Sequence, residues 1–301
     1  MVATVSLVRA ENRRNTVTKA LEAIGGDVGE SLRAKKRIVI KPNLVSPSNP
    51  VCATHVDTVR ATIDFLQKHT SAKMLIAEGS AFNTRSCFKN YGYSAIAEEY
   101  DIELVDLNED ESVQAKVFDR NLREVTITLA RTMVEADYRV SLAIPKTHDC
   151  LIATLSLKNM VVGSAQSDKN TLHADNVYSA MNLNMYEVVR RIPPSLAVID
   201  GWVGMEGNGP VDGTPVPMGV ALASTDFVAA DTVGAYIMGF DPTEIGYLTY
   251  ANGRLGEGDL SRIKVTGEEP SEVRRKFRPH QRYLAQKEWQ IPPDTLNRLL
   301  R

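Results

Sequence analysis

Short apolar runs alternate with amphipathic segments along most of the chain. Many of the runs are rich in β-branched residues and end in a charged residue, a proline or a glycine, which predicts buried strands. The strands predicted in this way cover residues 3–9, 37–41, 72–80, 101–107, 138–144, 195–201, 216–224 and 262–267. Helices are predicted between them, as in residues 55–69, where apolar side chains recur every three or four positions.

Continuous apolar strands that alternate with helices are typical of a parallel sheet covered by helices on both faces. We therefore expect an α/β fold with a mostly parallel sheet, as a catalytic-type domain over residues 1–270. This length suits one large domain, or two closely packed lobes over 1–150 and 151–270.

Three segments interrupt the alternation. Residues 113–130 predict a two-stranded excursion, and residues 151–162 fit either a helix or a strand. Residues 200–213 hold five glycines and predict an irregular loop whose backbone can approach a ligand closely. This loop contains neither a P-loop pattern nor a GxGxxG that opens a helix, so it does not imply nucleotide binding.

The tail over residues 271–301 differs from the rest of the chain, with eight Lys or Arg residues against three acids and with scattered prolines. Its composition predicts a solvated helix that wraps around the body. The alternative is an arm that binds a partner or joins subunits into a homo-oligomer.

Composition excludes several classes of partner. The chain has 301 residues, 43% of them hydrophobic, and a net charge of −2, which creates no general attraction to nucleic acid or anionic membrane. No window approaches the roughly 20 apolar residues of a membrane span, and the first residues do not resemble a signal peptide. The cysteines Cys52, Cys87 and Cys150 form no CxxC pair, so we expect no iron–sulfur cluster and a cytoplasmic location.

Four predicted strands end in, or lead into, a charged residue: Lys41, Glu78, Lys146 and Asp200. The carboxyl ends of parallel strands line one crevice, and ligands bind there. We therefore expect these four side chains to share one site. With Lys158, the lysines would form a cationic wall that needs an anion to compensate it, so the predicted guest is a small anionic molecule. In the alternative, each lysine pairs with a local carboxylate.

Other polar residues are candidates for binding the guest. Asn43 and Asn159 lie beside the lysines and can fix its orientation. The histidines His55, His148 and His173 can exchange protons near neutral pH, although a lone histidine is more often a surface or hydrogen-bonded residue. The remaining candidates are Gly207 and Gly209 in the glycine-rich segment. Cys150, near His148, is a faint candidate nucleophile.

Several acids near the expected crevice suit a hard divalent cation, Mg²⁺ or Mn²⁺. They are Glu78, Asp200, Glu206, Asp226 and Asp231. No ligand motif of fixed spacing supports this metal. Asp226 also has the residue type of a helix N-cap, whereas Asp231 lies in an apolar helix and needs a partner.

Several segments together resemble the family called domain of unknown function 362. They are IVIKPNLV (38–45), THVDTVRATIDFL (54–66), IAEGSAFNTRSCFKNYGY (76–93), IPKTHDCLIATLSLKNMVVG (144–163), LAVIDGWVGMEGNGPVDGTP (196–215) and ALASTDFVAADTVGA (221–235). The resemblance implies a shared fold and a shared site. The positions that match its pattern are Lys41, Asn43, His55, Glu78, Lys146, His148, Lys158, Asn159, Asp200, Glu206, Gly207, Gly209, Asp226 and Asp231.

The leading hypothesis is an enzyme that acts on a small anionic metabolite, with or without a divalent metal. Lys41 and Lys158 would bind the anion, Lys146 or His148 would exchange a proton, and the acids would hold the metal or orient the bases. One rival is a carrier that binds a metal or a metabolite without turnover. Another is an accessory redox protein without its own iron–sulfur cluster, because many relatives carry attached ferredoxin-like cysteine motifs that this sequence lacks.

Overall fold

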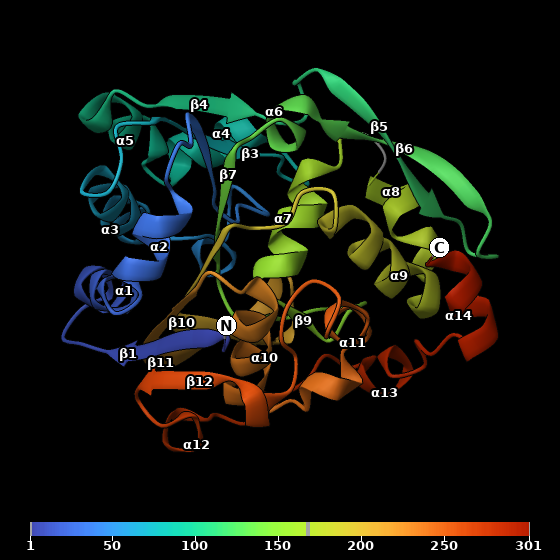
Figure 1. The fold of residues 1–301 in the computed structure, drawn as a ribbon. Helices are drawn as coiled ribbons and strands as arrows, with labels where there is room; N and C mark the ends of the chain where they lie inside the picture. Colours follow the sequence, from blue (N-terminus) through green and yellow to red (C-terminus); the bar gives the residue numbers. More distant parts are fainter. Residues whose placement is uncertain (1, 167–168, 301) are drawn as a thin grey trace.

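The computed structural model describes residues 2–166 and 169–300, and it places helices on both sides of one large sheet (Figure 1). The strand order of the main path is β12-β1-β11-β10-β7-β2-β3-β4. The strands are β1 (Thr4–Arg9), β2 (Arg37–Lys41), β3 (Lys73–Glu78), β4 (Glu103–Asp106), β7 (Tyr138–Ala143), β10 (Leu196–Asn208), β11 (Asp212–Ser224) and β12 (Lys264–Gly267). Strands β10, β7, β2, β3 and β4 are parallel, whereas β11 is antiparallel to β1 and β10. The predicted α/β fold with a mostly parallel sheet is confirmed.

Helices from the first hundred residues cover one face of the sheet. They are α1 (Arg13–Glu22), α2 (Gly25–Ser31), α3 (Val56–Gln67), α4 (Thr84–Asn90) and α5 (Tyr93–Tyr100). The apolar positions of α3 that recur at helical spacing, such as Val59 and Ile63, pack with Ile40, Val140 and Val198 of the sheet into one core.

Later helices cover the opposite face. They are α6 (Arg131–Val134), α7 (Ser156–Ser164), α8 (Lys169–Leu172), α9 (Tyr178–Val189), α10 (Phe227–Ile237) and α11 (Gly246–Ala251). Val39 and Ile199, which alternate with the residues of the first core, point to this side and join a second core. The sheet therefore separates two cores and contains strands from both of the proposed lobes.

Short elements complete the chain. The predicted two-stranded excursion is present as the hairpin of β5 (Ser112–Phe118) and β6 (Glu124–Ala130). The ambiguous residues 151–162 contain β9 (Ala153–Thr154), which pairs with β8 (Lys146–Thr147), and then enter α7. The 3-10 helices are η1 (Pro50–Cys52), η2 (Ala174–Asn176), η3 (Pro242–Glu244) and η4 (Leu260–Arg262).

The predicted glycine-rich loop is wrong, because β10 and β11 continue through most of it as a long hairpin. Glycine inside a strand often marks a place where other atoms come close to the backbone. At Gly204, an added Cβ would lie 2.8 Å from the ring of Phe277 and 2.9 Å from the carbonyl oxygen of Pro145. The glycines here allow close packing of the hairpin and coincide with local irregularities, a register shift between Gly201 and Val203 and a φ of 79° at Gly207.

The tail packs against the body as three short helices in the described residues, not as one solvated helix. They are α12 (Pro270–Val273), α13 (Tyr283–Gln286) and α14 (Pro293–Leu299). Val273, Phe277, Trp289 and Ile291 are buried in the second core. The basic residues of the tail are thus interspersed with apolar residues that attach it to the body.

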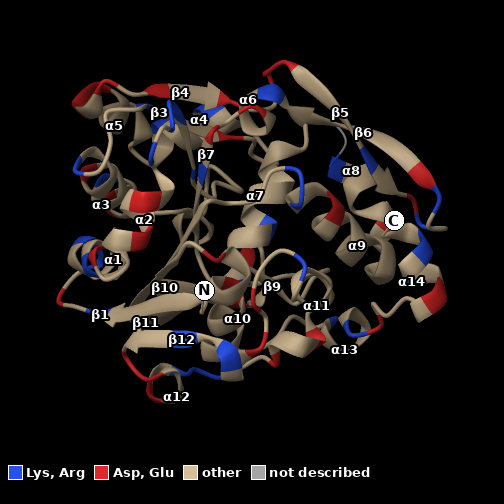
Figure 2. Cartoon of the chain, in the orientation of Figure 1, with Lys and Arg blue, Asp and Glu red and all other residues tan. Residues whose placement is uncertain are grey.

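Charged residues of both signs are spread over the outer helices and loops, as Figure 2 shows. Within the described residues, no helix combines the length and the apolar character that crossing a bilayer would require.

Candidate functional site

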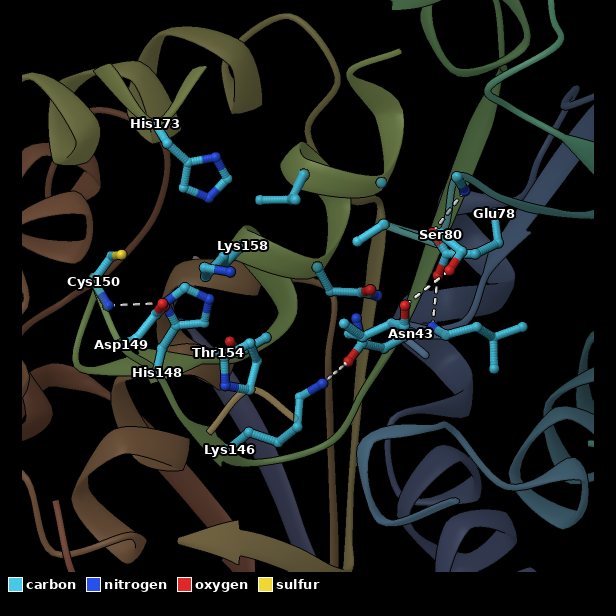
Figure 3. A pocket seen from close by; sticks show the side chains of 18 of the residues that line it. Asn43, Glu78, Ser80, Lys146, His148, Asp149, Cys150, Thr154, Lys158 and His173 are labelled. Atoms are coloured by element: carbon cyan, nitrogen blue, oxygen red, sulfur yellow. Dashed lines mark hydrogen bonds and ion pairs between the residues drawn. The ribbon is translucent and has the colours of Figure 1, made fainter. Parts of the chain in front are cut away.

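A cavity of about 500 Å³ lies beyond the carboxyl ends of β2, β3 and β7 (Figure 3). Its walls come from the segments that follow these strands, from α7 and from residues 170–176. The volume lies within the usual range for small-molecule sites. Of the residues predicted from the sequence, it gathers Asn43, Glu78, Lys146, His148, Lys158, Asn159 and His173.

Lys41 and Glu78 form a buried ion pair at the edge of this cavity. Their Nζ and Oε1 atoms are 2.8 Å apart, and Lys41 also donates to Asn159 Oδ1 at 3.2 Å. Glu78 accepts two backbone N–H groups as well, from Leu44 and Gly79. Burial lowers the pKa of Lys41, and the negative charge of Glu78 opposes this change. Lys41 therefore pairs with a local carboxylate, as in the alternative to an anionic guest that the sequence allowed for each lysine.

Gly163 of α7 allows the helix to rest on this ion pair. A Cβ atom at position 163 would lie 2.2 Å from Glu78 Oε1 and 2.4 Å from Lys41 Nζ. Such contacts are far inside van der Waals distance, so any larger residue would displace the helix or the pair. Gly163 lies in a segment that resembles the family, but its residue type gave no sign of this role.

Among the described residues, Lys146 has only neutral hydrogen-bond partners. Its Nζ donates to the side-chain oxygen of Asn43 and, at 3.2 Å, to the carbonyl oxygen of Cys52. Burial, with a smaller contribution from the charge of nearby Lys158, lowers the pKa of Lys146 to about 7. An amine that titrates near neutral pH can both give and take a proton.

Lys158, in the first turn of α7, is 5% exposed and makes no hydrogen bond or ion pair within the described residues. Burial lowers its pKa to about 8, although the negative charge of Asp149 acts in the opposite direction. The hydroxyl of Thr154, a residue that lines the same cavity, is also buried and has no partner in the part of the chain that the structure describes. Buried polar groups are rarely left unpaired, so these two groups indicate where a guest would bind.

The turn formed by His148, Asp149 and Cys150 brings together three groups that commonly bind metals. Their ligand atoms lie within 4.8 Å of one another. His148 Nδ1 accepts the backbone N–H of Cys150 at 3.1 Å and lies 2.9 Å from Asp149 Oδ1. Burial lowers the pKa of His148 to about 3 and raises that of Cys150 to about 12, so the imidazole is neutral and the thiol protonated at pH 7. A cation here would have to displace the thiol proton beside the positive charge of Lys158.

The predicted cluster of carboxylates is not assembled. In the described residues, His148, Asp149 and Cys150 form the one group of three possible metal ligands whose ligand atoms lie close together. None of the five predicted acids belongs to this group. Glu78 is paired with Lys41. Glu206 accepts the backbone N–H of Arg278 at 2.9 Å.

Two of the three remaining acids, Asp226 and Asp231, are helix caps. Asp226 accepts the N–H groups of Val228 and Ala229 at the start of α10, as its residue type suggested. Asp231 caps a different helix, α7, because its two oxygens accept the N–H groups of Ser156 and Leu157 at 2.7 and 2.8 Å.

Asp200 lies on the opposite face of the sheet from Lys41, contrary to the prediction of one shared site. Lys41 is in register with Ser141, and Ser141 is in register with Ala197. Successive side chains of a strand alternate between faces, so Asp200, three residues after Ala197, points the other way. There it accepts a hydrogen bond from Thr58 at 2.6 Å.

His55 is close to Asp200 and away from the cavity. It is 46% exposed, and its Nδ1 caps α3 by accepting the N–H of Asp57 at 3.2 Å. His173 lines the cavity, where burial lowers its pKa and Lys158 lowers it further. Gly207 and Gly209 lie outside the cavity lining, although the adjacent Pro210 is part of it.

Comparisons with known proteins place the chain in a family. The family model described as domain of unknown function (DUF362) matches residues 38–236. The thylakoid-associated protein sll1697 of Synechocystis sp. is 28% identical over 266 residues, which cover 85% of this chain and 80% of that protein. The lactate racemase apoprotein of Thermoanaerobacterium thermosaccharolyticum has a similar fold, with a TM-score of 0.51 and 15% identity. That similarity covers 78% of this chain but only 57% of the racemase. The chain belongs to the DUF362 family.

Proposed function

We propose that this protein binds a small organic anion in the cavity and exchanges a proton with it. The observation that carries the proposal is a largely buried lysine, Lys158, which lines the cavity and has no partner among the described residues, beside the buried unpartnered hydroxyl of Thr154. Removing an ammonium from water without a partner is costly, and an anion that accepts hydrogen bonds from both groups offsets this cost.

The other lysines have different roles in this scheme. Lys146 exchanges the proton, because its pKa is close to neutral pH. Burial lowers the pKa of His148 to about 3, so it stays neutral and is too weak a base for us to assign it the proton exchange. Lys41 is committed to Glu78 and Asn159, so we assign it to holding the wall of the cavity and not to binding the anion.

The first experiment measures binding by calorimetry and thermal shift, with acetate, lactate, malonate and inorganic phosphate as probes. Lactate is included because the structural neighbour is named for it and because it is a small monoanion. We expect at least one probe to raise the melting temperature, since a ligand that binds only the folded state stabilises it. Lys158→Met should weaken that binding by about tenfold to a hundredfold, the cost of losing a charged hydrogen bond.

The matched control is Lys89→Met, which removes an exposed lysine on α4. Equal loss of affinity in both variants, or binding that Lys158→Met leaves unchanged, would refute the proposal. Proton exchange is measured separately, as deuterium incorporation from D2O into the bound probe by NMR. Tight binding without incorporation would support the carrier and not the enzyme.

A further inference from the structure

The turn that carries His148 has a backbone conformation that needs external support. His148 N donates to Ile152 O at 3.0 Å and closes the turn. Ile152 has a φ of 60°, in the left-handed region. A β-branched residue is rare in this region and pays a conformational cost, so surrounding contacts must hold it there.

Gln286, from α13 of the tail, supplies this support. Its Oε1 accepts the N–H of Ile152 at 2.7 Å, and its Nε2 donates to the carbonyl oxygen of His148 at 2.8 Å. The side chain is 1% exposed, so solvent cannot readily replace either bond. A glutamine offers one acceptor and donors in a single planar group, and here it satisfies backbone groups at both ends of the turn.

Three other contacts attach the tail to the body and place Gln286. Phe277 N donates to Met238 O at 2.9 Å, Arg278 O accepts from Gly207 N at 2.7 Å, and Trp289 Nε1 donates to Glu244 O at 2.7 Å. The family model ends at residue 236, before any part of the tail.

The turn connects two strands that contribute groups to the cavity. Lys146 of β8 is in register with Thr154 of β9, and His148 lies between them in the chain. A displacement of the turn therefore moves groups that surround the proposed anion. We propose that Gln286 is a positioning residue, which holds the turn so that His148 and Thr154 face the cavity. The effect on anion binding rests on the proposed function, whereas the effect on the turn does not.

The test compares Gln286→Met, Gln286→Glu and the control Gln290→Met, which changes an exposed glutamine of the same tail. Amide hydrogen exchange of Ile152 is measured by NMR in the ligand-free protein. In Gln286→Met we expect exchange to be faster by about tenfold or more, as expected from the loss of a buried hydrogen bond. In Gln286→Glu the Ile152 amide should stay protected, because a carboxylate oxygen still accepts its hydrogen bond. Gln290→Met should change nothing.

The affinity for the anion that the wild type binds is then measured in the same variants. It should fall in both Gln286 variants, because each loses the donor to His148 O. Unchanged exchange in Gln286→Met would overturn the inference, and so would faster exchange combined with wild-type affinity. If Gln286→Met does not unfold cooperatively, Gln286→Glu provides the test. The inference then requires a protected Ile152 amide together with a lower affinity for the anion. If the wild type binds no probe, the proposed function is rejected. Faster exchange of the Ile152 amide in Gln286→Met would still support the role of Gln286 in holding the turn.

Discussion

Three lysines that look alike in the sequence have three different environments in the structure. Lys41 is neutralised by Glu78, Lys146 donates to neutral oxygens, and Lys158 has no partner within the described residues. Burial acts on all of them in the same direction, and the difference comes from the partner. At the scale of the residue, the chemistry of the cavity is therefore decided by what each ammonium can contact.

Anion binding should depend on pH because of Lys146 and Lys158. Their pKa values are about 7 and about 8, so each loses its positive charge as the pH rises through these values. We expect the affinity for the anionic probe to be highest near pH 6 and to fall between pH 7 and 9. Calorimetric titrations across this range measure the effect. In Lys158→Arg the fall should be smaller and should follow the titration of Lys146 near pH 7 alone, because a guanidinium stays charged throughout. An affinity that is constant from pH 6 to 9 would contradict this assignment.

At the scale of the element, α7 is the component that joins the core to the cavity. It contributes Lys158 and Asn159, and Gly163 lets it rest on the buried ion pair. Its first N–H groups are bound by Asp231 of α10 and not by a residue of its own sequence. The position of α7 thus depends on a helix that follows it by some seventy residues.

Replacing Asp231 with Asn should destabilise the protein. An amide can accept only one of the two N–H bonds, and its NH2 group would face the other N–H. The expected loss is about 1–3 kcal/mol in the free energy of unfolding, the usual cost of leaving a buried donor unpaired. Urea denaturation measures it, with Asp212→Asn as the control at an exposed position whose side chain makes no hydrogen bond or ion pair in the described part of the chain. Equal stability of the two variants would show that the cap contributes nothing.

The sequence predicted the strands and the cluster of lysines better than the grouping of the acids. Lys41 and Asp200 both end an apolar run, and nothing in either run states how the strands are aligned. Because side chains alternate along a strand, a shift of one residue in that alignment reverses the face. The apolar run alone therefore predicts the wrong face of the sheet for Asp200. The role of Gln286 depends on a contact across 134 residues, for which no local pattern exists.

At the scale of the whole molecule, the sheet and the tail connect residues 1–150 and 151–270, for which the sequence predicts one domain with two closely packed lobes as the alternative. Strand β10 pairs with β7, and β7 pairs with β2, so residues 151–270 complete a sheet begun by residues 1–150. The second core contains Val5 and Leu7 from the first strand together with Trp289 and Ile291 from the tail. Neither proposed lobe has a core made only of its own residues.

This arrangement predicts that the chain unfolds in one transition. Urea denaturation followed by far-ultraviolet circular dichroism and by tryptophan fluorescence should give coincident curves, because Trp202 on β10 and Trp289 in the tail share the structure that circular dichroism reports. A fragment of residues 1–150 should lack a cooperative transition, since the face of its sheet that Val39 and Leu75 occupy would lose the helices that cover it. Two separated transitions, or a fragment that folds alone, would favour independent lobes. In that case the cavity, whose walls come from both halves of the chain, would lie at an interface between them.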